Sequence, residues 1–142
     1  MPSHKENKFL PYSSVEMFDL VAAIDRYPEF LPWCKGARVK ERRGDRITAD
    51  LLIGYKIFQE KFTSVVTLER PNRIVVNYQS GPLSHLSNEW TFTENGKGCA
   101  VGFFVDFDFH SPLLSSIMDV FFDRALSKMA GAFEARAEEL YG

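Results

Sequence analysis

The C-terminal part of the chain carries the longest regular pattern. Apolar residues recur there at helical spacing and form one broad stripe, while Ser116, Asp119 and Asp123 lie on the opposite side. Ser111 is suited to cap a helix and Pro112 to occupy its first position. The pattern predicts one helix from residue 112 to the end, with an apolar stripe of Leu114, Met118, Phe121, Phe122, Ala125, Leu126, Met129, Ala132, Phe133 and Leu140.

The middle of the chain has a different period, because apolar and polar residues alternate there in short runs. Turn residues such as Gly44-Asp45, Pro71-Asn72 and Asn95-Gly96 separate the runs, and both features are typical of antiparallel strands. We predict strands over residues 37–43, 46–53, 58–68, 73–79, 85–94 and 101–109. The last of these is the clearest, since one face would carry Val101, Phe103, Val105, Phe107 and Phe109.

The N-terminal part predicts one further strand and two short helices. A short strand ends at Leu10, a helix begins after Ser13 or Ser14, and a second helical stretch over 24–27 is expected to stop at Pro28. The order of elements indicates a single α+β domain over 1–142, in which a curved antiparallel sheet wraps round the last helix. Such a sheet rarely fills all the space beneath a long helix, so an internal cavity is expected.

Composition strengthens the expectation of a cavity. Hydrophobic residues make up 45% and charged residues 25% of the 142 residues, which is ordinary for a globular domain. Aromatic residues reach 14%, with 13 Phe. This excess indicates either a large core or a large apolar cavity.

The formal net charge of −2 argues against a general nucleic-acid binder, because such domains are usually strongly basic. A local basic excess nevertheless stands out. It consists of Lys35, Arg38, Lys40, Arg42, Arg43 and Arg46. These residues form either an ordinary solvated strand and turn or a contact surface for an anionic membrane or RNA.

No residues stand in the spacing of a catalytic or metal site. Cys34 and Cys99 form no motif, and the three histidines are far apart in sequence. Asp106 and Asp108 share a strand face but lie opposite the aromatic row, so they are expected to face water. Cys34 is expected to be a small buried thiol, and His85 and His110 either to be hydrogen-bonded or solvated or to polarise a ligand carbonyl.

The location predicted from the sequence is the cytoplasm. The first residues lack the apolar run of a signal peptide, and no stretch reaches the length of a membrane span. A cytoplasmic protein is therefore expected, either free or peripheral on the inner membrane face.

Four segments resemble a known family. They are Asp25-Arg26-Tyr27-Pro28-Glu29-Phe30-Leu31-Pro32-Trp33-Cys34, Gly81-Pro82-Leu83, the strand from Leu86 with Trp90-Thr91-Phe92, and Ala132 to Ala137 with Tyr141-Gly142. Over residues 8–142 the chain resembles the coenzyme Q-binding family of START-like proteins, which also contains ribosome association toxins and has carried the label polyketide cyclase or dehydrase. The resemblance implies the helix-grip fold, START/Bet v 1-like, and ubiquinone binding.

The chain departs from that family at one point. After the Gly-Pro turn the family usually has Phe and a basic residue, whereas this chain has Leu83 and Ser84. If the basic residue contacts a ligand head group or an anionic partner, this protein lacks that contact.

The expected ligand-binding residues combine the aromatic rows with the family segments. The expected binding residues near Trp33 form either an apolar lip at the cavity entrance or a hydrophobic plug of the core. The full set is Tyr27, Phe30, Leu31, Trp33, Leu83, Leu86, Trp90, Phe92, Val101, Phe103, Val105, Leu114, Met118, Phe121, Phe122, Ala125 and Met129.

Three functions follow as hypotheses. The first is a non-catalytic carrier of ubiquinone, or of a related isoprenoid quinone, that supports respiratory electron transport and contacts the membrane surface. The second is a ribosome-associated toxin that binds a ribosomal subunit and blocks subunit association. The third is a cyclase-type enzyme, for which no acid or base with a motif is present.

Overall fold

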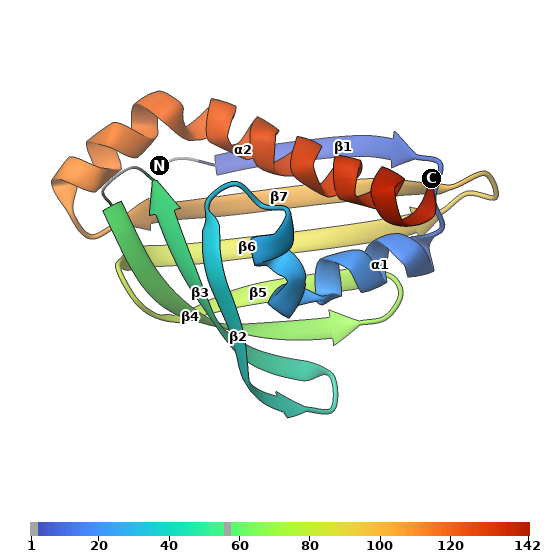
Figure 1. The fold of residues 1–142 in the computed structure, drawn as a ribbon, viewed down its shortest axis with the longest axis horizontal. Helices are drawn as coiled ribbons and strands as arrows, with labels where there is room; N and C mark the ends of the chain where they lie inside the picture. The colour runs from blue at the N-terminus through green and yellow to red at the C-terminus, as the bar shows by residue number, and fades with distance from the viewer. Residues whose placement is uncertain (1–2, 56–57) are drawn as a thin grey trace.

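One curved antiparallel sheet dominates the structure, a computed structural model that describes residues 3–55 and 58–142, except for the side chains of Tyr55, Phe58 and Phe121. Within these residues seven strands pair in the order β1-β7-β6-β5-β4-β3-β2 (Figure 1). Their bounds are β1 (Ser3–Leu10), β2 (Cys34–Arg43), β3 (Arg46–Tyr55), β4 (Phe58–Glu69), β5 (Arg73–Ser80), β6 (Leu83–Glu94) and β7 (Cys99–Phe109).

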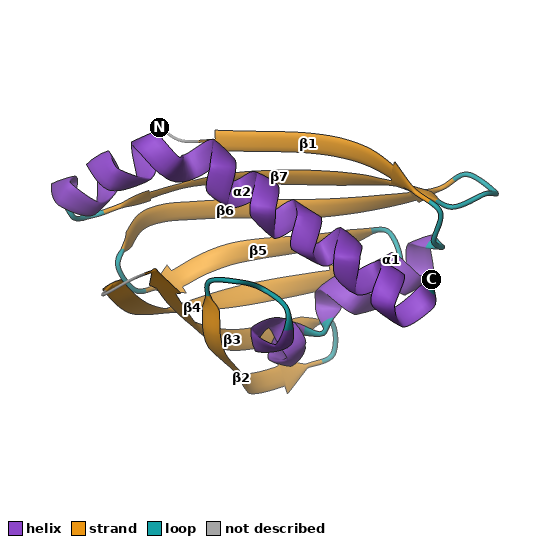
Figure 2. Cartoon of the chain, turned by 45° about the horizontal axis from the view of Figure 1, so that its top comes forward, coloured by secondary structure: helices purple, strands orange, loops and turns teal. Residues whose placement is uncertain are grey.

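Two α-helices and a 3-10 helix accompany the sheet. They are α1 (Ser14–Ala22), η1 (Ile24–Glu29) and α2 (Pro112–Tyr141). Figure 2 shows α2 lying along one face of the sheet, with α1 beneath its C-terminal end. The helix-grip arrangement predicted from the sequence is therefore confirmed.

Local sequence signals explain where the helices begin. The Ser13 hydroxyl accepts a hydrogen bond from the Glu16 amide at 3.1 Å, and the Glu16 carboxylate accepts one from the Ser13 amide at 3.0 Å. This capping box identifies Ser13 as the cap of α1. Ser14 has another role, because its amide and hydroxyl donate to Glu94 of β6 at 2.9 and 3.0 Å. The Ser111 hydroxyl caps α2, and Pro112 follows it as predicted.

Two local predictions are wrong. Pro28 does not end the second helical stretch but lies inside η1, which continues to Glu29. The turn tolerates Pro28 because the Tyr27 carbonyl accepts from the amides of Phe30 and Leu31 at 3.2 and 2.9 Å, which closes the helix without a proline N–H.

Leu140 is the second wrong prediction, since it is 49% exposed instead of lying in the apolar stripe. The last turn of α2 lies against α1, where the Tyr141 hydroxyl donates to the Glu16 carbonyl at 3.2 Å. The sheet therefore no longer covers this turn, and the last fully buried position of α2 is Ala137.

The C-terminal half of α2 packs on a solid core, whereas its N-terminal half covers a cavity. Phe18 of α1 and Phe92 of β6 are each 1% exposed, and their rings form an edge contact with centroids 5.9 Å apart. Phe133 and Ala137 of α2 are also buried. In the N-terminal half of the helix, Leu114, Met118 and Ala125 are half-buried, because they border a hollow space.

Candidate ligand-binding cavity

A cavity of about 430 Å³ lies between the sheet and the N-terminal half of α2. Its wall is predominantly apolar and comes from all elements except β1, together with the loop before β2. Volumes of this size are typical of sites for small organic ligands. The expected binding residues that line it are Tyr27, Leu31, Trp33, Leu83, Leu86, Trp90, Phe103, Val105, Leu114, Met118, Ala125 and Met129.

Four expected residues lie outside the cavity wall. Phe92 and Phe122 are buried in the core, and Val101 faces the space between β1 and α2. Phe30 packs edge-on against Phe133, with ring centroids 5.2 Å apart. All four belong to elements or segments that line the cavity elsewhere along their length. They lie outside its wall because the cavity extends along only part of each element or segment. The side chain of Phe121, also expected in the wall, lies outside the described residues.

The strands β3 to β5 supply much of the wall, and the sequence reasoning missed them. Their inward side chains are mostly aliphatic, and these strands therefore lack the aromatic rows from which the cavity wall was predicted. The period-two alternation would have identified the inward face, but not its position over the cavity. These missed residues are Leu51, Ile53, Phe62, Val66, Ile74 and Val76.

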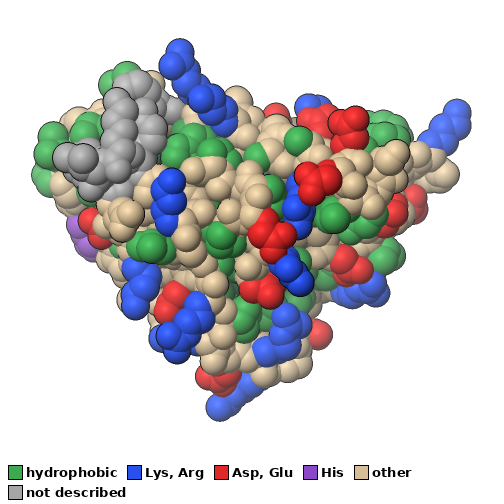
Figure 3. Space-filling view, in the orientation of Figure 1, with side chains coloured by type: hydrophobic (Ala, Val, Ile, Leu, Met, Phe, Trp, Pro, Cys, Tyr) green, Lys and Arg blue, Asp and Glu red, His purple; other side chains and the backbone are tan. Residues whose placement is uncertain are grey.

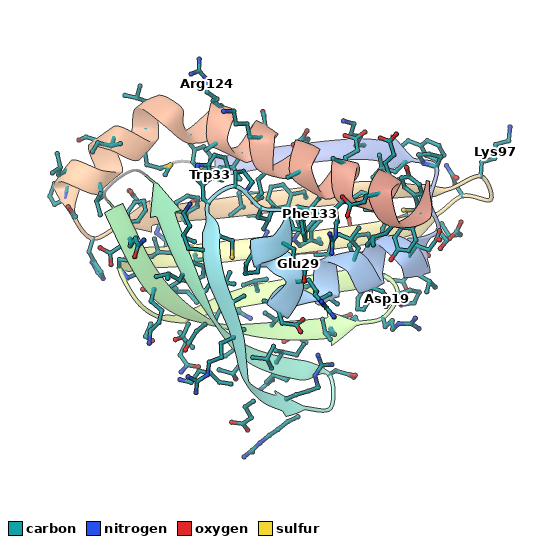
Figure 4. The ribbon with its side chains drawn as sticks, in the orientation of Figure 1. Asp19, Glu29, Trp33, Lys97, Arg124 and Phe133 are labelled. Atoms are coloured by element: carbon teal, nitrogen blue, oxygen red, sulfur yellow. The ribbon has the colours of Figure 1, made fainter. Side chains whose placement is uncertain are left out.

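The cavity reaches the protein surface beside α2. Arg124 and Lys128 belong to its wall although both are exposed. Figure 4 shows Trp33 under this half of the helix, while Arg124 extends away from the sheet. Trp33 is half-buried and also lines the cavity. We call the opening bordered by Trp33, Arg124 and Lys128 the mouth.

The segment of residues 25–34, which we call the Trp33 segment, has two parts with different surroundings. Its first part is fixed to α2: the Arg136 guanidinium donates to Glu29 at 2.7 Å and lies over the Phe30 ring, 5.2 Å from its centroid. Hydrogen bonds from Arg26 and Arg136 lower the pKa of Glu29. Phe30 thus packs against α2, while Leu31 and Trp33 line the cavity.

Tyr27 packs against Phe30, with ring centroids 6.0 Å apart, and also lines the cavity. Its hydroxyl donates to the Val21 carbonyl, and burial raises the pKa of Tyr27 well above its ordinary value. The phenol therefore stays protonated at neutral pH. Because the single O–H is already used, Tyr27 offers the cavity an apolar ring and no free hydroxyl donor.

Few polar groups interrupt the apolar wall away from the mouth. Ser64 is 3% exposed and lines the cavity with its hydroxyl group. Asn88 donates one N–H to the Phe104 carbonyl at 2.8 Å, which leaves its second N–H and its amide oxygen. Glu60 adds one carboxylate. The cavity can thus hold a largely apolar molecule that carries a few hydrogen-bonding atoms.

The titratable residues considered for catalysis lie elsewhere. His85 contacts Asp106 at 3.0 Å on the opposite face of the sheet from the cavity. The Asp108 carboxylate accepts a hydrogen bond from Ser115 at 2.7 Å, which lowers the pKa of Asp108. His110 is exposed. None of these four side chains contributes to the cavity wall.

Cys34 lies in the cavity wall and is 8% exposed, as expected for a buried thiol. Burial raises the pKa of Cys34, so the reactive thiolate is disfavoured at neutral pH. Among the described residues, no three Cys, His, Asp or Glu side chains are grouped so that they could hold a metal ion. Within the same part of the chain, no helix is long and apolar enough to cross a membrane.

The fold and the cavity together define a helix-grip protein with an internal apolar cavity. The chain belongs to the family described as polyketide cyclase / dehydrase and lipid transport, whose sequence model matches residues 10–134. The family resemblance recognised in the sequence is thereby confirmed.

Relatives named as toxins and relatives named as coenzyme Q-binding proteins both align with this chain. The ribosome association toxin RatA of Pseudomonas aeruginosa is 34% identical over 144 residues, which cover 100% of both chains. The mitochondrial coenzyme Q-binding protein COQ10 homolog B of Xenopus laevis is 31% identical over 144 residues. That alignment covers 98% of this chain and 59% of the relative.

Solved structures agree on the fold. The 18 kDa protein CC1736 of Caulobacter crescentus has a TM-score of 0.81 and 35% identity, covering 100% of this chain and 99% of that one. A START superfamily protein of Mycobacterium smegmatis has a TM-score of 0.84 and 18% identity, covering 97% and 98%. The Zhui aromatase/cyclase of Streptomyces has a TM-score of 0.83 and 14% identity, covering 96% and 93%. The last two likenesses concern the fold alone.

Proposed function

We propose that this protein binds ubiquinone, or a related isoprenoid quinone, in the cavity and carries it without catalysing a reaction. The observation that carries the proposal is the cavity itself, about 430 Å³ in volume, with an apolar wall and few polar side chains. An isoprenoid tail matches the apolar wall. The hydroxyl of Ser64 and the amide of Asn88 can donate hydrogen bonds to quinone carbonyls.

The energetics favour loading at a membrane. Each CH₂ of the tail gains about 0.8 kcal/mol on leaving water, but it gains the same in a bilayer. The protein therefore competes with the membrane through the shape of the cavity, through head-group hydrogen bonds, and through direct transfer at the membrane surface. A relative named for coenzyme Q binding supports this assignment. We accordingly place the protein in the cytoplasm or at the inner membrane face, in support of respiratory electron transport.

The proposal is tested by analysing what the protein retains during purification. Native mass spectrometry and organic extraction of the purified protein are expected to yield a quinone, up to one molecule per chain. A protein that neither retains a quinone nor binds added short-tail ubiquinone in detergent would contradict the proposal. The variant Met118→Trp, discussed below, locates any binding in the cavity.

A ribosome-binding activity is the second candidate, and a different surface supports it. Arg42, Arg43 and Arg46 are exposed at the turn between β2 and β3. A full-length relative is named a ribosome association toxin. Sedimentation with purified ribosomal subunits tests this candidate, and replacement of all three arginines by glutamate should abolish such sedimentation because the charges facing RNA phosphates are reversed. If the unmodified protein does not sediment with ribosomal subunits, the ribosome-binding candidate is rejected.

A further inference from the structure

The N-terminal half of α2 exposes large apolar side chains to solvent. Leu113 is 64% and Val120 is 76% exposed, the two highest values among the large apolar residues that the structure describes. They are seven residues apart, or two helical turns, and so lie on the same face of α2. Neither side chain lines the cavity.

Basic side chains follow on the flank of the helix beside the mouth. Arg124 and Lys128 both line the mouth, and among the described residues neither has an acidic partner within salt-bridge distance. They are four residues apart, and like charges at this spacing destabilise a helix. The spacing thus favours an external anionic partner.

The acidic residues of the same half are kept away from the mouth. Asp119 and Asp123 are a helical turn apart, and Asp123 lies on the flank facing β1, with its carboxylate 3.9 Å from Nδ1 of His4. One flank of the helix is therefore basic and the other acidic. Figure 3 shows hydrophobic side chains at the end of the molecule where α2 begins.

We propose that residues 113–128 of α2 dock on a bilayer that contains anionic phospholipids. Leu113 and Val120 enter the boundary between head groups and acyl chains, while Arg124 and Lys128 bind lipid phosphates. An apolar face flanked by basic residues is the pattern of an interfacial helix. RNA fits this surface less well, because single-stranded bases are bound by stacking on aromatic rings, and Leu113 and Val120 provide none.

Docking in this orientation brings the mouth to the membrane surface. Ile117, Arg124 and Lys128 line the cavity and belong to the helix that docks. A lipid tail can then pass from the bilayer into the cavity without crossing water. This consequence rests on the proposed function, whereas the docking itself does not require a bound quinone.

The experiment compares paired variants in a vesicle flotation assay without quinone. Vesicles of phosphatidylcholine alone are compared with vesicles that also contain phosphatidylglycerol. The variant L113S/V120S is expected to bind both kinds of vesicle at least about tenfold more weakly, since it loses most of the inserted apolar surface. The variant R124E/K128E is expected to lose at least about tenfold in affinity for the anionic vesicles only, and 0.5 M salt should have the same effect on the unmodified protein.

Matched controls replace residues of the same type elsewhere. L140S removes an exposed apolar side chain at the other end of α2, and R42E/R43E reverses two exposed charges at the β2–β3 turn, at the opposite end of the molecule in Figure 1. Both controls should bind vesicles as the unmodified protein does. Equal losses in the controls, or unchanged binding by the two test variants, would overturn the proposal.

Two further measurements separate the possible failures. L113S/V120S should bind short-tail ubiquinone in detergent with unchanged affinity, because neither side chain lines the cavity. If the protein docks on vesicles but binds no quinone, the membrane-docking surface of α2 is supported and the proposed function is rejected. If R124E/K128E binds vesicles normally but loses sedimentation with ribosomal subunits, the partner is RNA and the docking proposal is wrong.

Discussion

The ring of Tyr27 stands perpendicular to the ring of Phe133, with the two centroids 5.4 Å apart and an interplanar angle of 90°. Tyr27 belongs to η1 and Phe133 to the C-terminal half of α2. Both rings also line the cavity. The contact therefore joins the start of the Trp33 segment to the long helix where the core meets the cavity.

The hydroxyl of Tyr27 should contribute measurably to stability. Tyr27→Phe removes its hydrogen bond to the Val21 carbonyl and leaves that buried acceptor without its donor, so a loss of about 1–2 kcal/mol in the free energy of unfolding is expected. Tyr141→Phe is the matched control, because its hydroxyl also donates to a carbonyl but at an exposed site. Urea unfolding of both variants is the measurement, and equal losses would contradict the burial argument.

Filling the cavity should block ligand binding without unfolding the protein. Met118 lines the cavity and is half-buried, so the larger ring of Met118→Trp has free volume to occupy. We expect quinone affinity to fall at least about tenfold, equivalent to about 1.4 kcal/mol, with a modest loss of stability. The control Val120→Trp places the same ring on the exposed side of the helix. A Met118→Trp protein that binds quinone as well as the unmodified chain would show that this part of α2 is not the binding wall.

Acid should weaken the attachment of η1 to α2. The pKa of Glu29 is lowered from its ordinary value of 4.5 by hydrogen bonds from Arg26 and Arg136. The stabilisation is therefore complete above pH 4.5 and is lost as the pH falls through the lower pKa of the folded state. Glu29→Gln should unfold more easily at pH 7 than the unmodified protein, and the two should converge on acidification.

The control for this pH dependence is Glu139→Gln. Glu139 also accepts a hydrogen bond from Arg136, at 3.1 Å, but is 68% exposed. Its replacement should change the free energy of unfolding less than that of Glu29, because Glu139 is more exposed and pairs with one arginine, whereas Glu29 pairs with two. A Glu29→Gln protein whose stability differs from the unmodified chain by the same amount at pH 3 and pH 7 would argue against the ion pair.

Trp33 at the mouth should respond to membranes. In a Trp90→Phe background the emission of Trp33 reports its surroundings, and it should shift to shorter wavelength when anionic vesicles are added, because Trp favours the interface. Trp33→Ala should slow quinone transfer between vesicles. It should also weaken binding somewhat, since the ring is part of the cavity wall. A fixed emission spectrum together with an unchanged transfer rate would assign Trp33 to the interior.

The order and type of the elements were determined by the sequence, because the signals are local. The 3.6-residue and two-residue periods distinguish α2 from the strands, and Ser111 with Pro112 defines where α2 begins. The inward face of β7 follows from the alternation of Val101, Phe103 and Val105 alone. The cavity was predictable only as a consequence of this architecture and of the many aromatic residues.

Only the tertiary structure decided which members of one apolar row border the cavity. Met118 and Phe122 are one turn apart in the same stripe, yet Met118 lines the cavity and Phe122 is in the core. Likewise Trp90 lines the cavity, whereas Phe92, two residues further along β6, does not. The period of a helix or strand fixes the direction in which a side chain points. What the side chain meets depends on how far α2 and the curved sheet stand apart at that position, and this separation is set by residues distant in sequence.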